Sequence, residues 1–131
     1  MIASSQFLRR AFAADALASG ATGVLLAFGG ATLASLAGLQ AALTQPAGYF
    51  LIAYAAFVGF LGVRATLPGA VVWLVIVGNA IWAIESLMLL ALGRAQPTPL
   101  GYAFVIGQAL AVAAFAELQF TGLRRSLRLA A

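Results

Sequence analysis

The sequence contains no cysteine and no histidine. Without cysteine there is no disulfide, no thiolate metal ligand and no thiol nucleophile. Without histidine the chain lacks the commonest metal and haem ligand and the usual general base. We therefore expect no cofactor, no metal site and no catalytic residue, and we predict that the protein is not an enzyme.

Charged residues are also scarce. They make up 8% of the 131 residues, whereas 64% are hydrophobic. A soluble globule of this size needs more polar surface than that, so the sequence predicts a single domain, residues 1–131, with lipid as its solvent. The seven cations are all arginine and lie between apolar runs. They form no continuous basic face, so nucleic acid is not an expected partner.

Four apolar stretches are long enough to cross a bilayer, which takes about 20 helical residues. Turns that contain Gly, Pro or Arg separate most of them. The predicted fold is an all-α membrane protein, a bundle of four transmembrane helices. The predicted spans are residues 8–29, 48–64, 70–92 and 100–122.

The segment between the first two spans predicts a short additional helix. Gly29 and Gly30 interrupt the first apolar run and permit a bend. A straight continuation would exceed the length of one crossing, so residues 31–43 are predicted to form an interfacial helix. Residues 44–48, which include Pro46, are predicted as the turn that follows. Tyr49 and Tyr54 are then expected to anchor the second span at the interface.

The N-terminus has an alternative interpretation as a secretory signal, because Arg9 and Arg10 precede an apolar run. Against this, the small-residue stretch 16–18 comes before the apolar core and no clear cleavage site comes after it. The first segment is therefore predicted to remain as a helix.

The arginines predict the orientation. With four spans, both termini and the turn at Arg64 lie on one side, and Arg94 lies alone on the other. Because arginine is enriched in cytoplasmic loops, we expect both termini of a multi-pass bacterial inner-membrane protein to be cytoplasmic. The cytoplasmic arginines would be Arg9, Arg10, Arg64, Arg124, Arg125 and Arg128.

Polar residues in the third span predict a polar seam. Asn79, Trp82 and Ser86 share one helical face, and Glu85 lies about 60° further round. In the fourth span Gln108 and Gln119 lie on one stripe. We expect the three amides and Ser86 to bond between helices, and Gly78 to allow close helix approach.

Glu85 has two competing interpretations. It lies about 6 Å from the middle of its span, too deep to reach water easily. It could serve as a proton, cation or ligand site together with Asn79, Trp82, Ser86 and Gln108. Alternatively, a protonated Glu85 could form a structural bond to another helix.

The other two acidic residues are predicted to pair with arginine. In the expected topology Asp15 and Glu117 lie at the same cytoplasmic depth, where Arg9, Arg10 and Arg124 are near. These residues are therefore candidates for interhelical or interfacial charge contacts.

Three motifs in the last two predicted spans carry a resemblance. They are residues 78–86 (GNAIWAIES), 107–109 (GQA) and 116–124 (AELQFTGLR). On these motifs, and over nearly the whole length, the chain resembles uncharacterised bacterial four-span integral membrane proteins, in which Asp often stands in place of Glu85. The resemblance implies the architecture and no activity.

These features predict a non-catalytic accessory or scaffold module with a polar intramembrane seam. Its partners would be the lipid bilayer and a second copy or another membrane protein. The alternative is a small oligomeric transporter or channel that uses Glu85 as a proton or cation site, and an integral-membrane enzyme has the least support.

Overall fold

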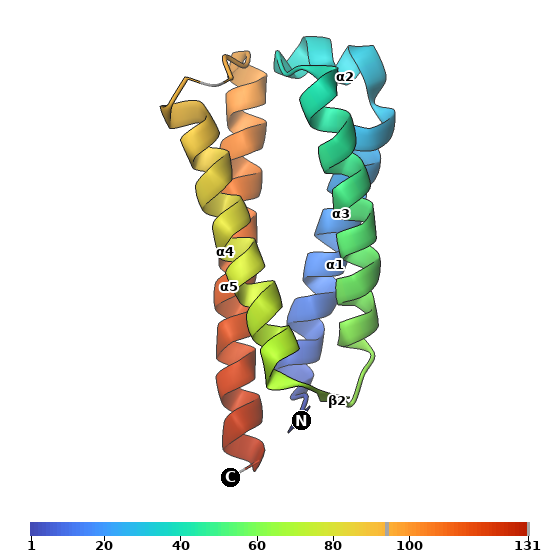
Figure 1. Cartoon of the computed structure of the whole chain (residues 1–131), viewed down its shortest axis with the longest axis vertical. Helices are drawn as coiled ribbons and strands as arrows, with labels where there is room; N and C mark the ends of the chain where they lie inside the picture. The colour runs from blue at the N-terminus through green and yellow to red at the C-terminus, as the bar shows by residue number, and fades with distance from the viewer. Residues whose placement is uncertain (94, 131) are drawn as a thin grey trace.

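The computed structural model describes residues 1–93 and 95–130 (Figure 1). Four of its helices are long and apolar enough to cross a membrane, so an all-helical chain with four candidate spans is confirmed. Two two-residue strands, β1 and β2, pair antiparallel near the N-terminus. The elements are β1 Ile2–Ala3, α1 Gln6–Phe28, α2 Gly30–Ala37, α3 Ala41–Gly62, β2 Thr66–Leu67, α4 Gly69–Ala91 and α5 Pro99–Ala130.

The break after the first span lies where the paired glycines predict it. Helix α1 ends at Phe28, and Gly30 has a φ of 59°, a left-handed conformation that suits a residue without a Cβ. Helix α2 ends at Ala37, and Gly38, which caps it, is also left-handed. The short helix is therefore present but covers only Gly30–Ala37. Its interfacial position stays a prediction.

The predicted turn at residues 44–48 is wrong, because α3 begins at Ala41 and contains Pro46. A proline removes a single backbone hydrogen bond near the start of a helix. Packing against α1 favours helix here: Gly48 approaches α1 so closely that a Cβ on it would clash with the backbone nitrogen of Ala27. The second span therefore starts about seven residues earlier than predicted.

Helix α5 also exceeds its predicted end at residue 122 and continues to Ala130. The basic residues beyond Gly122 continue the same helix. Arginine near a helix C-terminus interacts favourably with the helix dipole, and Arg128 lies in the last turn.

The long helices form two antiparallel pairs, α1 with α3 and α4 with α5 (Figure 1). Contact between α1 and α5 joins the pairs. They approach closely at the end that holds both termini and β2 and diverge toward the other end, where the end of α2 contacts the start of α5. An apolar cluster fills the close end, and its buried members are Ile2, Leu8, Phe12, Val58, Leu61, Leu67, Val72, Val75, Ile76 and Leu123.

Candidate functional site

A buried group of polar side chains joins all four long helices, and we call it the polar junction. It begins with Asp15 on α1, whose side chain has no exposed surface. Leu8, Phe12 and Ser19 lie on the same face of α1 and are also buried, so this face points to the interior. The members of the polar junction are Asp15, Ser19, Tyr54, Asn79 and Gln119.

Asp15 is the acceptor at the centre of the polar junction. Its Oδ1 accepts a hydrogen bond from the Ser19 hydroxyl at 2.9 Å. Its Oδ2 lies 2.8 Å from the Tyr54 hydroxyl, 3.0 Å from Nδ2 of Asn79 and 2.6 Å from Nε2 of Gln119. One carboxyl group therefore contacts a polar atom from each of the other three long helices.

Asn79 links the remaining members. Its Nδ2 also donates to Oε1 of Gln119 at 2.9 Å, and its Oδ1 lies 2.7 Å from the Tyr54 hydroxyl. The interhelical bonds predicted for Asn79 and Gln119 are therefore present. Each such bond in a membrane protein contributes about 0.6 kcal/mol on average.

A second polar contact ties α4 to α5 nearer the α2 end. The indole N–H of Trp82 donates to Oε1 of Gln108 at 2.9 Å, as expected for an interhelical amide. Ser86 instead donates to the Trp82 carbonyl of its own helix at 2.8 Å, and it forms no interhelical bond to any residue that the structure describes, so that prediction is wrong. Hydroxyls commonly bond back to the preceding turn in this way.

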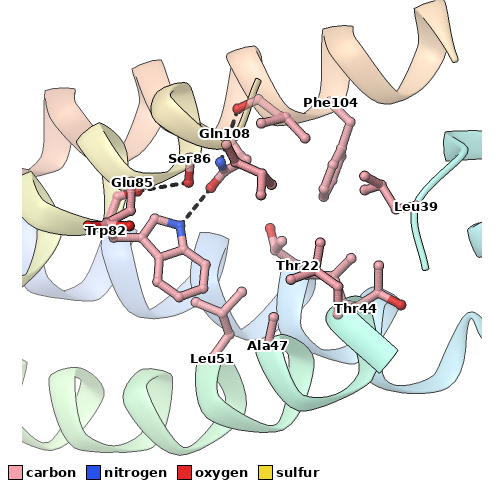
Figure 2. A pocket seen from close by; sticks show the side chains of 14 residues that line it. Thr22, Leu39, Thr44, Ala47, Leu51, Trp82, Glu85, Ser86, Phe104 and Gln108 are labelled. Atoms are coloured by element: carbon pink, nitrogen blue, oxygen red, sulfur yellow. Dashed lines mark hydrogen bonds between the residues drawn. The ribbon is translucent and has the colours of Figure 1, made fainter. Parts of the chain in front are cut away.

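Two apolar cavities lie beside these contacts. The aromatic cavity, about 510 Å³, lies between α3 and α4 and is lined by Phe50, Tyr54, Asn79, Trp82 and Glu85 among others. The inner cavity, about 260 Å³, lies nearer α2 (Figure 2). In Figure 2, Glu85 and Trp82 lie at one side of the inner cavity and Leu39 lies at the other. Leu51, Trp82 and Glu85 line both cavities and so form their shared wall.

A third cavity extends the series to the end of the bundle. This loop cavity, about 470 Å³, is lined by residues of the segments around Gly38 and Gly93. It shares Leu39, Leu43 and Leu89 with the inner cavity. The three cavities therefore follow one another from the polar junction to the α2 end.

Glu85 is exposed at the shared wall. Within residues 1–93 and 95–130 it takes part in no ion pair and no side-chain hydrogen bond. An unpaired carboxylate at this depth is costly in hydrocarbon, by roughly 2.5 to 3.5 kcal/mol for an acidic side chain at a helix centre. It is therefore a group that gains from meeting a cation or a hydrogen-bond donor.

Aromatic rings line the aromatic cavity next to Glu85. The Phe50 ring stacks on Trp82 with centroids 5.8 Å apart and on Tyr54 with centroids 6.4 Å apart. The interplanar angles are 8° and 17°. The negative faces of aromatic rings attract cations, and indole does so best.

The predicted arginine partners of Asp15 are wrong. Asp15 faces the interior of the bundle, and within the described part of the chain it forms no ion pair. Nε of Arg9 donates to the Gly62 carbonyl at 3.2 Å, and the Arg124 guanidinium lies 5.8 Å from the Phe120 ring centroid. Glu117 is exposed on α5, away from the polar junction. In the ranges 1–93 and 95–130 it too forms no ion pair.

Two junction residues were not expected from the sequence. Tyr54 was predicted to be an interfacial anchor, because the mistaken turn made the second span start at Gly48. With α3 starting at Ala41, Tyr54 lies near the middle of the helix and its hydroxyl meets Asp15. Ser19 follows Asp15 by four residues. This helical spacing places both side chains on one face, and it would have predicted their contact.

Comparisons with protein-family models, curated proteins and solved structures found no match. The resemblance to bacterial four-span membrane proteins therefore stays a prediction.

Proposed function

We propose that the protein is a small multi-pass transporter or carrier of the bacterial inner membrane that binds an apolar organic cation. The observation that supports this most is the position of Glu85 at the wall shared by the aromatic and inner cavities. An apolar ligand body would fill the cavities, and its positive charge would neutralise the carboxylate.

The chemistry of the lining supports an organic cation rather than a hydrated metal ion. Hard cations need several oxygen ligands, whereas the walls around Glu85 are mostly aliphatic and aromatic. Within the described residues no cluster of three potential metal-ligating side chains occurs. A carboxylate beside stacked aromatic faces suits a diffuse charge on an apolar body.

The polar junction gives less support to a scaffold function. A scaffold whose polar seam pairs with sister chains would present amides outward. Here Asn79 and Gln119 bond to each other and to Asp15 within one chain. The polar junction instead holds the two helix pairs together at the base of the cavities.

Both termini are proposed to be cytoplasmic, because arginine is concentrated at the end of the bundle that holds both termini and β2. Arg9 lies in the first turn of α1, Arg64 precedes β2, and Arg128 lies in the last turn of α5. The end of the bundle that holds α2 would then face the periplasm, with α2 lying along the interface. The series of cavities supports a binding site that communicates with that side.

Equilibrium binding of tetraphenylphosphonium to the purified protein in nanodiscs tests the proposal. We expect saturable binding, and we expect Glu85→Gln to raise the dissociation constant by about tenfold or more. A tenfold change corresponds to about 1.4 kcal/mol of binding free energy. Glu117→Gln is the matched control, because it removes an exposed carboxylate that lines none of the three cavities described. Equal binding by both variants, or no saturable binding, would refute the site.

A further inference from the structure

When Asp15 is ionised, the polar junction contains one more contact between polar atoms than its side chains have protons to place between them. Six pairs of polar atoms lie within 2.6 to 3.0 Å among its five side chains. Each pair at this distance needs one proton between its atoms. The pairs are Ser19–Asp15, Tyr54–Asp15, Tyr54–Asn79, Asn79–Asp15, Asn79–Gln119 and Gln119–Asp15.

Five protons serve these six contacts when Asp15 is ionised. The Ser19 hydroxyl gives one and the amide of Asn79 gives two. One N–H of Gln119 points to Asp15, and the Tyr54 hydroxyl has a single proton for two oxygen neighbours. With an ionised Asp15, one of the two contacts of Tyr54 is a pair of oxygens with no proton between them.

Reversing the side-chain amides does not remove the deficit. If Asn79 is reversed, its oxygen faces Oδ2 of Asp15 and Oε1 of Gln119, and two contacts lack a proton. If Gln119 is reversed, its nitrogen faces Nδ2 of Asn79 and its oxygen faces Asp15. Reversing both leaves two oxygens against Oδ2 of Asp15. The orientations in the structure leave the fewest contacts unmatched.

The geometry points to Asp15 as a neutral carboxylic acid that stores a proton at the centre of the bundle. Its Oδ2–H donates to the Tyr54 hydroxyl, and the Tyr54 hydroxyl donates to Oδ1 of Asn79. All six contacts are then matched, and no charge is buried without a partner. An uncompensated buried charge is strongly unfavourable, and within residues 1–93 and 95–130 no cation pairs with Asp15.

The groups that face Asp15 support this assignment. Tyr54 is the titratable group that meets it from α3, whereas α4 and α5 present the neutral amides of Asn79 and Gln119. Glu85 lies six positions beyond Asn79 on α4, and Glu117 is exposed. The two arginines of α1, Arg9 and Arg10, are both exposed, and Arg9 contacts the Gly62 carbonyl instead.

The stored proton lies next to the aromatic cavity, because Ser19, Tyr54 and Asn79 all line it. If Asp15 is neutral, Glu85 is the carboxylate that a cation would meet in this cavity. That consequence rests on the proposed function. The assignment of the proton itself depends only on the contacts of the polar junction.

Isotope-edited infrared spectroscopy tests the proton directly, because Asp15 is the single aspartate of the chain. Protein labelled with carboxyl-¹³C aspartate is compared with unlabelled protein in nanodiscs near neutral pH, without any ligand. We expect a carboxylic-acid C=O band that shifts on labelling. A labelled signal only at carboxylate frequencies would overturn the proposal, and it would leave the cation-binding test unaffected.

Three further variants localise the proton. Glu85→Gln and Glu117→Gln should each keep the label-sensitive acid band, whereas its loss in both would overturn the assignment. Tyr54→Phe removes two contacts and one proton, so four contacts then match four protons with Asp15 ionised. We expect the acid band to weaken in Tyr54→Phe, and an unchanged band would show that Tyr54 does not position the proton.

Discussion

The indole nitrogen of Trp82 lies 2.9 Å from Oε1 of Gln108, and this bond fixes the ring at the wall between the aromatic and inner cavities. The Gln108 side chain is fixed by a second hydrogen bond, in which its Nε2 donates to the Val105 carbonyl at 3.0 Å. The contact therefore connects the packing of α4 on α5 with the shape of the proposed site.

Gln108→Leu should lower stability by about 1–2 kcal/mol, because it leaves the Trp82 N–H without an acceptor in an apolar setting. It should also broaden the cavity wall and weaken cation binding. Thermal unfolding in detergent and probe binding are the measurements. Gln45→Leu is the control, since Gln45 is exposed on α3 and should leave both unchanged. Equal effects of the two variants would contradict a role for the Trp82–Gln108 bond.

Asn79→Leu should destabilise the protein more than any single-bond variant. It removes three contacts of the polar junction and leaves the amide of Gln119 and the Tyr54 hydroxyl with fewer partners. We expect a loss of about 2 kcal/mol, the upper range for interhelical bonds in membranes. Ser86→Ala, which loses a bond within its own helix, should cost far less in the same unfolding assay. A reversed order would contradict the polar junction.

Gly48→Ala should destabilise the α1–α3 pair by about 1–3 kcal/mol, because an added Cβ would clash with the Ala27 backbone. Gly78→Ala is the matched control. A Cβ there would have no atom of the described residues within 4 Å, so alanine should be neutral or slightly stabilising in the middle of α4. The close approach predicted at Gly78 is thus wrong, and close packing occurs at Gly48 instead.

Reporter fusions after Ala131 test the orientation. An enzyme reporter that works only in the cytoplasm should be active there, and one that works only in the periplasm should be inactive. A fusion within the loop near residue 96 should give the opposite pair of results. Periplasmic activity of the C-terminal fusion would reverse the proposed topology.

The four spans and the glycine break were predictable from the sequence because both depend on local properties. These properties are the length and apolarity of each stretch and the backbone freedom of glycine. It failed at Pro46 because tertiary packing at Gly48 outweighed the local turn signal. The same error hid Tyr54, whose place along the bundle depends on where α3 begins.

The site was predicted only in part. Helical spacing placed Asn79 and Trp82 on one face, and both bond to α5. Whether Asp15 points to the headgroups or to the interior depends on the rotation of α1. Its buried neighbours Leu8 and Phe12 determine that rotation, and no charge count shows it.

Fluorescence of Trp82 measures the proposed cation site most directly. The chain has two tryptophans, so Trp73→Phe leaves Trp82, which lines both cavities, as the single indole. A bromophenyl-substituted phosphonium should quench it saturably, and adding Glu85→Gln should abolish saturation while adding Glu117→Gln should not. Linear quenching of the same slope in all three proteins would mean that the probe only dissolves in the bilayer, and it would contradict the account.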